Sequence, residues 1–425
     1  MKLLIQNGRV IDPASKMDAV SDLLVEDGRI LKVEKNIEEE ADQTIDAKGC
    51  FVMPGFIDLH VHLRDPGFEE KETVATGAKA AARGGFTTIL AMPNTKPVVD
   101  DADVVSYVHQ KAKNLAPIQV LQIGAVTEGQ EGKKLADIHR MVQAGIPAIS
   151  EDGKSVMDTA VYYKAMQIAK EEGIPVFAHC EDKALVQGGV MNAGKRAQEL
   201  RLPGISNEAE DVIAARDIVL AAATGVHLHL CHCSTRGSVQ MVKYARENGV
   251  KITAEACPHH FTLSDEDIPG DNANYKMNPP LRSPKDVEAI KEGLKNDIID
   301  VIATDHAPHT AIEKGLPMKK APFGIVGLET AAALTYSELV LKDYLTPMQM
   351  AEKMSYNPAM VIGSEKGTLQ EGSIADIVIF DPNQNYTIQT EDFVGKAKNT
   401  PFENRKVTGK VITTIVSGEV VYSAE

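Results

Sequence analysis

Eight short apolar runs, rich in β-branched residues, alternate with helix-forming stretches between Pro54 and Lys366 of this 425-residue chain. One such stretch, 72-ETVATGAKAAARGG-85, ends at a Gly-Gly pair, as the C-terminus of a helix does. Eight apolar strands, each followed by a helix, predict an α/β fold, a closed (β/α)8 barrel of the TIM type; a doubly wound open sheet is the alternative. The runs are 56–61, 86–92, 118–126, 146–150, 175–180, 226–233, 252–257 and 299–305.

The two ends of the chain have a different character, because short β-rich runs there are joined by turn dipeptides. The segments LLIQNGRVID and DLLVEDGRILKVE near the N-terminus read as hairpins, and ADIVIFD and KVITTIVSGEVVY near the C-terminus have the same character. Neither end is long enough for a stable sheet of its own. We therefore predict one small β-sandwich domain from residues 1–53 plus 365–425, and a barrel domain from residues 54–364.

The net charge of the chain limits the kinds of molecule that it is expected to bind. With 45 basic and 60 acidic residues, the formal net charge is −15, which argues against nucleic acid or an anionic membrane as the main partner. A small anionic substrate stays possible, because a local arginine can outweigh a distant net charge. The first apolar run is too short for a signal peptide and no run is long enough to span a bilayer, so we expect a cytoplasmic protein.

The five cysteines are odd in number and scattered, as reduced thiols are. Cys231 and Cys233 flank a histidine and could form a soft metal site, but burial of the thiols is the favoured interpretation.

Polar side chains with metal-binding chemistry follow the apolar runs where each predicted strand ends. In the segment 55-GFIDLHVHLRDPG-67, two histidines lie two residues apart and share a strand face. An isolated pair of this kind is as often merely hydrogen-bonded. Six donors at the same end of five different strands, however, suit zinc or another divalent ion, and they exceed the needs of one tetrahedral ion. These residues are His60, His62, Asp152, His179, His232 and Asp305.

Further motifs make the sequence recognisable. Together with HLRDPG, they resemble the type I class of bacterial dihydroorotases in the amidohydrolase superfamily, and the likeness runs through the whole barrel into the flanking β segments. Members of that class reversibly close N-carbamoyl-L-aspartate to L-dihydroorotate, the third step of pyrimidine synthesis. The motifs are AMPNT (91–95), SEDG (150–153), AHCED (178–182), CHCST (231–235), ACPHHF (256–261), MNPPLR (277–282) and TDHAPH (304–309).

The resemblance implies one or two zinc ions and a role for each matching residue. His60 and His62 would bind the first metal, His179 and His232 the second, and Asp152 would bridge them. Asp305 would bind the first metal and transfer the proton as the catalytic residue. The implied substrate contacts are His62, Arg64, Asn94, Asn278, His309, and the backbone at Phe323 and Gly324.

One position departs from the wider superfamily, many of whose members bridge two metals with a carbamylated lysine on the fourth strand. The segment 146-IPAISEDGK-154 has no lysine within the strand. We favour Asp152 as the bridge, because its carboxylate offers oxygen ligands without modification. Lys154, which lies past the strand, and Glu151 are the alternatives.

Three functional hypotheses follow. Dihydroorotase is the first; a related cyclic-amide hydrolase, such as an allantoinase or a hydantoinase, is the second; a catalytically silent scaffold homologue is the third. The resemblance also suggests a homodimer and an association with aspartate transcarbamoylase, as in some relatives. The segment 310–324 is expected to be a lid or simply a long loop.

Four other histidines receive lesser roles. We expect His259 and His260 to be supporting or loop residues. His227 and His229 share a strand face with Cys231, so they should point away from the barrel axis.

Overall fold

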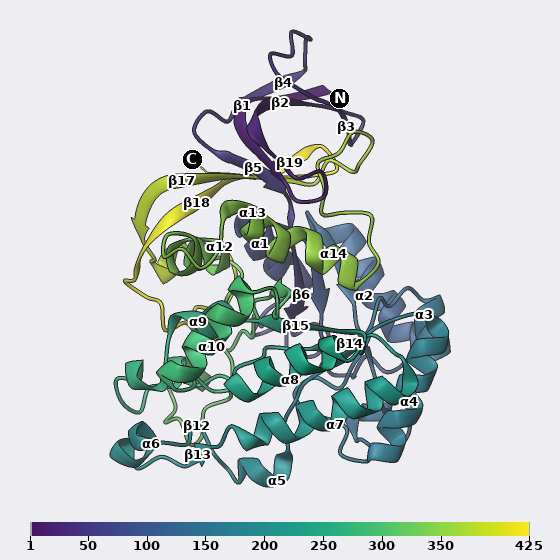
Figure 1. Cartoon of the computed structure of the whole chain (residues 1–425), viewed down its shortest axis with the longest axis vertical. Coiled ribbons are helices and arrows are strands. Elements are labelled where there is room, and N and C mark those ends of the chain that lie inside the picture. The colour runs from purple at the N-terminus through teal and green to yellow at the C-terminus, as the bar shows by residue number, and fades with distance from the viewer. Residues whose placement is uncertain (1, 425) are drawn as a thin grey trace.

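A computed structural model of the chain, which describes residues 2–424, has a barrel of parallel strands with a β-sheet packed at one side (Figure 1). Each predicted strand is present; β6 has the bounds of its apolar run, and the others are shorter than theirs or, for 118–126, broken in two. The barrel strands are β6 (Phe56–Val61), β7 (Phe86–Ala91), β8 (Gln119–Gln122), β9 (Gly124–Ala125), β10 (Ile149–Ser150), β11 (Val176–Ala178), β14 (Leu228–Leu230), β15 (Ile252–Ala256) and β16 (Val301–Ile302).

Backbone hydrogen bonds join these strands into a ring. Strands β6, β7 and β8 pair in parallel, and so do β9, β10, β11, β14, β15 and β16 in that order. The chain passes from β8 to β9 through Ile123, whose N–H bonds to the carbonyl of Ala91. On the other side, Val61 forms a parallel bridge with His306, just beyond β16. The ring therefore has eight positions, since β8 and β9 form one broken strand, and the predicted barrel is confirmed.

Helices pack around the barrel in alternation with the strands (Figure 1). Helix α1 begins after the N-cap Thr73 and ends at Gly84, as its sequence predicts. The helices are α1 (Val74–Arg83), α2 (Ala102–Leu115), α3 (Ile138–Gln143), α4 (Thr159–Glu172), α5 (Lys183–Val186), α6 (Lys195–Leu200), α7 (Glu208–Thr224), α8 (Arg236–Glu247), α9 (Pro258–Thr262), α10 (Pro284–Lys295), α11 (Ala311–Lys314), α12 (Ala331–Thr335), α13 (Pro347–Ala351) and α14 (Asn357–Val361). A two-stranded sheet of β12 (Met191–Asn192) and β13 (Gly204–Ile205) lies in the segment between β11 and β14.

The barrel interior is apolar below the ends of the strands, so the polar residues at those ends lie above a tightly packed core. Side chains such as Leu59, Leu90, Phe177 and Val301 form one buried cluster inside the ring. A larger cluster fills the space between the strands and the outer helices. This packing fixes where each strand ends and therefore where its terminal side chains lie.

Both ends of the chain contribute to a second sheet. Its strands follow the order β19, β18, β17, β5, β1, β2, β3, and β4 pairs with β1. Buried residues of β1, β2, β5, β17 and β18 share one apolar cluster, so the sheet folds over a common core. The domain boundaries at 53/54 and 364/365 stay a prediction. The strands are β1 (Lys2–Asp12), β2 (Met17–Glu26), β3 (Arg29–Glu34), β4 (Gln43–Asp46), β5 (Phe51–Pro54), β17 (Ile377–Thr387), β18 (Lys406–Val416) and β19 (Glu419–Ser423).

Candidate metal centre and active site

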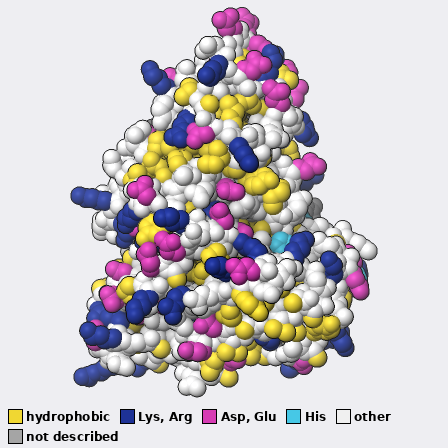
Figure 2. Space-filling view, viewed as in Figure 1, with side chains coloured by type: hydrophobic (Ala, Val, Ile, Leu, Met, Phe, Trp, Pro, Cys, Tyr) yellow, Lys and Arg dark blue, Asp and Glu magenta, His cyan; other side chains and the backbone are white. Residues whose placement is uncertain are grey.

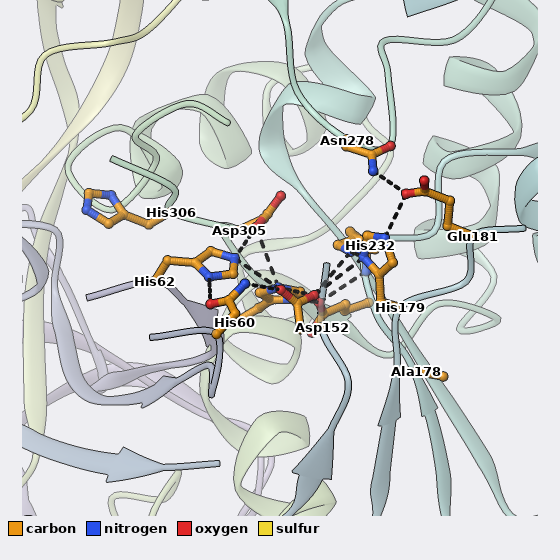
Figure 3. Close-up of polar contacts among 12 residues, drawn as sticks. His60, His62, Asp152, Ala178, His179, Glu181, His232, Asn278, Asp305 and His306 are labelled. Carbon is orange, nitrogen blue, oxygen red and sulfur yellow. Dashed lines mark hydrogen bonds and ion pairs between the residues drawn. The ribbon is translucent and has the colours of Figure 1, made fainter. Parts of the chain in front are cut away.

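The six side chains that the sequence predicts to bind metal converge at one end of the barrel (Figure 3). They come from five strands: one lies in β6, and the others follow β6, β10, β11, β14 and β16 within a few residues. All six are nearly inaccessible to solvent. Their exposed fractions are 0% for His60, 5% for His62, 3% for Asp152, 5% for His179, 2% for His232 and 6% for Asp305.

Asp152 lies at the centre of the cluster. Its Oδ1 is 3.2 Å from His60 Nε2, 3.4 Å from His179 Nδ1 and 3.8 Å from His232 Nε2. Its Oδ2 is 3.4 Å from His62 Nε2. One carboxylate thus faces all four imidazoles, which is the position that a bridging ligand between two metal ions requires.

Asp305 lies on the side of the cluster formed by the β6 histidines. Its Oδ1 is 3.1 Å from His62 Nε2 and 3.5 Å from His60 Nε2. One nitrogen from each of these histidines and one oxygen of Asp305 lie within 4.8 Å of one another, as do ligand atoms of His60, Asp152 and His232. Two overlapping groups of donors, sharing His60, therefore surround the centre.

The backbone is strained where several of these side chains leave their strands. His232 and Asp305 have φ angles of 33° and 48°, and Arg64 has 60°. Residues other than glycine rarely adopt such values, and the strain costs of order 1–3 kcal/mol at each position. The surrounding contacts hold these residues in the conformation that directs their side chains to the cluster.

Burial and charge together set the protonation of the site. Burial by itself would lower the pKa of His60, but the carboxylates of Asp152 and Glu255 raise it well above its usual value. Burial would raise the pKa of Asp152, yet His60, His179 and His232 hold it well below its usual range. Carboxylates that face imidazoles in so buried a place favour a cation at the centre, whether a proton or a metal ion.

The residues present fit a divalent metal ion. His60 Nε2 and Asp152 Oδ1 are buried, face each other, and form no hydrogen bond within the described residues 2–424. Buried polar atoms are rarely left without a partner, and imidazole nitrogen with carboxylate oxygen is a donor set suited to zinc and related ions. The site therefore has the chemistry of a metal centre.

The two alternatives to Asp152 as the bridging residue, Glu151 and Lys154, have other surroundings. Glu151 accepts hydrogen bonds from the backbone N–H groups of Val126 and Thr127 and from the Thr127 hydroxyl. Lys154 is exposed. Asp152 is thus the one of the three that faces the histidines.

A cavity of about 210 Å³ opens next to the metal-binding cluster. All seven side chains or backbone positions that the sequence assigns to substrate contact line this cavity, together with Asp152, Gly153, His179, His232, Asp305 and Ala307. Those seven are His62, Arg64, Asn94, Asn278, His309, Phe323 and Gly324.

Arg64 supplies the positive charge on one side of this cavity, and His309 lies beside it as a neutral imidazole, because burial and the charge of Arg64 lower the pKa of His309 to about 3. Arg64 Nη2 is 3.3 Å from His309 Nε2, and Arg64 Nε donates to the carbonyl of Pro308 at 3.2 Å. His309 Nε2 is also 2.7 Å from the carbonyl oxygen of Phe323. The guanidinium is therefore fixed at the cavity wall, where it can bind an anionic group.

Asn94 has a second role that the sequence does not reveal. Its Oδ1 lies 2.9 Å from His62 Nδ1, and its Nδ2 donates to Asp152 Oδ2 at 3.2 Å. The amide therefore orients two of the metal-binding side chains as well as lining the cavity.

Two carboxylates of the site were missed in the sequence. Glu255 is buried in β15, and its Oε1 accepts from His60 Nδ1 at 2.7 Å and from the His232 backbone N–H at 3.1 Å. Glu181 Oε2 lies 3.0 Å from His179 Nε2. An acidic residue within the apolar run 252-ITAEAC-257 was the available signal for Glu255, and the proximity of Glu181 to His179 in AHCED was the signal for the other.

The predicted direction of His229 is wrong. Its ring packs against Phe177 inside the barrel, with 4.6 Å between the ring centroids, and its Nε2 is 3.0 Å from Glu255 Oε2. The parity argument fails because His232 lies beyond the regular strand, at a positive φ, so it no longer alternates with His229. His227 Nε2 bonds to the Thr253 hydroxyl.

Cys231 and Cys233 do not converge on a shared site, since Cys231 packs inside the barrel and Cys233 in the outer core. His259 and His260 are buried on α9, and His260 Nε2 bonds to the carbonyl of Pro279 at 2.9 Å.

No helix within residues 2–424 is long and apolar enough to cross a membrane.

Comparison with known proteins gives the family. A model of the amidohydrolase family matches residues 51–421. The chain is 49% identical over 423 residues to the dihydroorotase of Clostridioides difficile (strain 630), covering 99% of this chain and 100% of that one. It is 48% identical over 422 residues to the dihydroorotase of Pelotomaculum thermopropionicum, covering 99% and 98%.

Solved structures of cyclic-amide hydrolases share the fold. The dihydropyrimidinase from Brevibacillus agri has a TM-score of 0.87 at 27% identity, covering 100% of this chain and 95% of that one. A D-hydantoinase has a TM-score of 0.88 at 28% identity, with the same coverage. The fold, the metal-binding cluster and the full-length relatives agree: this chain belongs to the amidohydrolase family, among its dihydroorotases.

Proposed function

We propose that this chain is a zinc-dependent dihydroorotase, which reversibly converts N-carbamoyl-L-aspartate to L-dihydroorotate and water. The observation that supports this best is one cavity whose lining includes five of the six predicted metal ligands, all but the deeper His60, together with Arg64 and His309. Dihydroorotate carries a carboxylate beside its cyclic amide, so its recognition requires a cation next to the hydrolytic centre.

His60, His62, Asp152, His179, His232 and Asp305 would hold one or two zinc ions. Zinc bound there would lower the pKa of a water molecule towards about 7 and polarise the carbonyl under attack. The proximity of Asp152 to all four imidazoles supports its role as the bridge.

Asp305 is the proposed proton carrier. Burial would raise the pKa of this carboxyl, but His60 and His62 hold it below its usual range, so it is ionised at neutral pH. In the hydrolytic direction it accepts the proton of the attacking water and returns it to the departing ring nitrogen. Ring closure runs through the same transfers in reverse.

Arg64, Asn94 and His309 are proposed to hold the substrate carboxylate, with Asn278 and the backbone of Phe323 and Gly324 holding the ring. Fixing the carboxylate sets the position of the amide carbonyl relative to the metal centre. A dihydropyrimidinase or hydantoinase substrate lacks this carboxylate, so the cationic wall favours dihydroorotate over the related cyclic amides.

The test compares dihydroorotate, allantoin, dihydrouracil and hydantoin with one zinc-loaded preparation. We expect kcat/KM for dihydroorotate to exceed the others by roughly 10³-fold or more, because a site built for a charged group rejects ligands that lack it. Metal analysis on the same preparation should find one or two zinc ions per chain. Equal activity on the neutral substrates would favour the hydantoinase hypothesis, and a protein that takes up no metal would favour the scaffold hypothesis.

The oligomeric state, the protein partner and the location in the cell stay predictions. A homodimer, an association with aspartate transcarbamoylase and a cytoplasmic location are supported only by the resemblance to dihydroorotases and by the sequence.

A further inference from the structure

One carboxylate connects the metal-binding cluster to the substrate cavity. Glu181 follows β11, whereas Asn278 lies in the loop before α10. Figure 3 shows Glu181 between His179 and Asn278, and a single oxygen, Oε2, receives hydrogen bonds from both. Since the bond to His179 is 3.0 Å long and that to Asn278 Nδ2 is also formed, Glu181 holds two side chains from different parts of the barrel.

The contact with Glu181 decides which nitrogen of His179 faces the centre. In the neutral form of His179, the form that can bind a metal, the imidazole has one N–H, and because a carboxylate can only accept, this hydrogen lies on Nε2. The lone pair is then on Nδ1, which is 3.4 Å from Asp152 Oδ1 and 2.9 Å from His232 Nε2. Carboxylates that hold the outer N–H of a ligating histidine fix both its tautomer and its ring orientation.

The same contact decides which end of the Asn278 amide is available to a ligand. Because Glu181 accepts and cannot donate, Nδ2 must be the atom that faces it. Within the described residues, Asn278 Oδ1 receives no hydrogen bond, and Asn278 lines the cavity. Asn278 is therefore set to accept a hydrogen bond from a substrate N–H group.

We propose that Glu181 is a positioning residue that couples the two halves of the site, directing His179 Nδ1 to the metal centre and making Asn278 the acceptor for an N–H of the cyclic ureide. The inference rests on the proposed function for its substrate part, while its metal part concerns only the cluster. It adds a group that touches neither the centre nor the substrate, and that acts through one residue on each side.

Three variants separate this role from a structural one. Glu181→Ala removes the shared oxygen. Glu181→Gln keeps an oxygen that can occupy the position of Oε2 and accept from both partners, so it is the conservative rescue. Asp182→Ala is the matched control, because it removes the neighbouring carboxylate. That carboxylate caps α5 by accepting from the N–H groups of Ala184 and Leu185, its hydrogen bonds within residues 2–424.

Zinc affinity, measured by competition with a chromogenic chelator, tests whether Glu181 positions His179, and this test needs no turnover. We expect Glu181→Ala to weaken zinc binding by about 10- to 100-fold, and Glu181→Gln to stay within about 3-fold of wild type. Asp182→Ala should bind zinc as wild type does. Equal zinc affinity in wild type and Glu181→Ala would refute the proposed effect of Glu181 on His179.

Steady-state kinetics at saturating zinc test whether Glu181 positions Asn278 for the substrate. Glu181→Ala should raise KM for dihydroorotate about 10-fold, and adding Asn278→Ala to it should raise KM little further, since both changes remove the same interaction. Fully additive effects on KM would refute the coupling. If metal-free Glu181→Ala unfolds at a much lower temperature than metal-free Asp182→Ala, the role is structural and the proposal fails.

The two proposals can fail separately. A wild-type protein that binds zinc but does not hydrolyse dihydroorotate would refute the proposed function, while the chelator competition would still decide whether Glu181 positions His179.

Discussion

Lys314 anchors the backbone that forms one wall of the substrate cavity. Its ammonium donates to the carbonyl oxygens of Gly324 at 2.7 Å, and of Lys276 and Pro322 at 3.1 Å each. Phe323 and Gly324 line the cavity. Replacing this residue by methionine, Lys314→Met, keeps the apolar stem and removes all three hydrogen bonds, so it tests whether this wall is positioned by the buried lysine.

The three carbonyl oxygens are not left equally short of hydrogen-bond donors when Lys314 is replaced. Gly324 O keeps a bond from Asn399 Nδ2, and Lys276 O keeps one from the Gly324 N–H. Pro322 O, which is only partly buried, loses its donor at a cost of about 1 kcal/mol, and the other two bonds add about 0.5–1 kcal/mol each.

An opposing effect comes from the ammonium itself, because burial lowers the pKa of Lys314 to about 7. Removing a charge that is costly to bury offsets part of the loss. We expect a net destabilisation of about 1–3 kcal/mol.

The kinetic effect should be larger on KM than on metal binding. Without its anchor the wall at Phe323 and Gly324 shifts, and we expect KM for dihydroorotate to rise about 10-fold, equivalent to about 1.4 kcal/mol. Zinc content should be unchanged, because among the described residues the Lys314 ammonium bonds to backbone carbonyls and to none of the predicted metal ligands.

The assay combines urea unfolding with steady-state kinetics at saturating zinc. The matched control is Lys319→Met, which changes an exposed lysine of the same segment and should leave both quantities within experimental error. If Lys314→Met matches the control in stability and in KM, the buried ammonium does not position the cavity wall.

Four further outcomes are expected. Asp305→Asn should keep some zinc and lose about 10²- to 10⁴-fold in kcat; a fully active variant would exclude Asp305 as the proton carrier. Arg64→Lys should raise KM about 10-fold with little change in kcat, because lysine cannot form the bidentate contact; an unchanged KM would move carboxylate recognition elsewhere. Burial raises the pKa of Asp217 to about 7 from 3.8, so the folded chain binds a proton that the unfolded chain releases between these values. The unfolding free energy of wild type, minus that of Asp217→Asn, should therefore fall with rising pH by up to about 4 kcal/mol across this window, and a flat difference would contradict it. Zinc uptake by the metal-free protein at pH 7 should release about one proton or more per chain, read with a pH indicator in weak buffer, and the absence of release would show that the imidazoles are already neutral.

The sequence was sufficient for the barrel because the strands are buried on both sides and read as continuous apolar runs. Strand ends could be located to within a few residues, and in a barrel the ends of all strands meet at one face. Knowing that face was enough to bring His60, His179, His232 and Asp305 together, although they lie far apart in the chain.

Side-chain direction was less predictable, because it depends on the backbone beyond the regular strand. The pairing of β6 with β7 shifts register between Asp58 and Val61, and His232 adopts a positive φ. Each irregularity changes which face a side chain points to, so a strict alternation placed His229 on the wrong side. Tertiary contacts impose these irregularities, and a local pattern does not encode them.

Glu255 shows why the supporting groups are harder to find than the ligands. Burial would raise the pKa of its carboxyl, yet contacts with His60 and His229 lower it to about 2, so it is a third buried negative charge beside Asp152 and Asp305. In the metal-free protein, protons supply the compensating charge: burial would lower the pKa of His179, but Asp152 and Glu181 raise it to about 10. A histidine that carries this proton on Nδ1 cannot bind a metal through that atom. Metal ions and protons therefore compete for the same charge-balancing role, and the carboxylates that orient the histidines also set how strongly the empty site holds its protons.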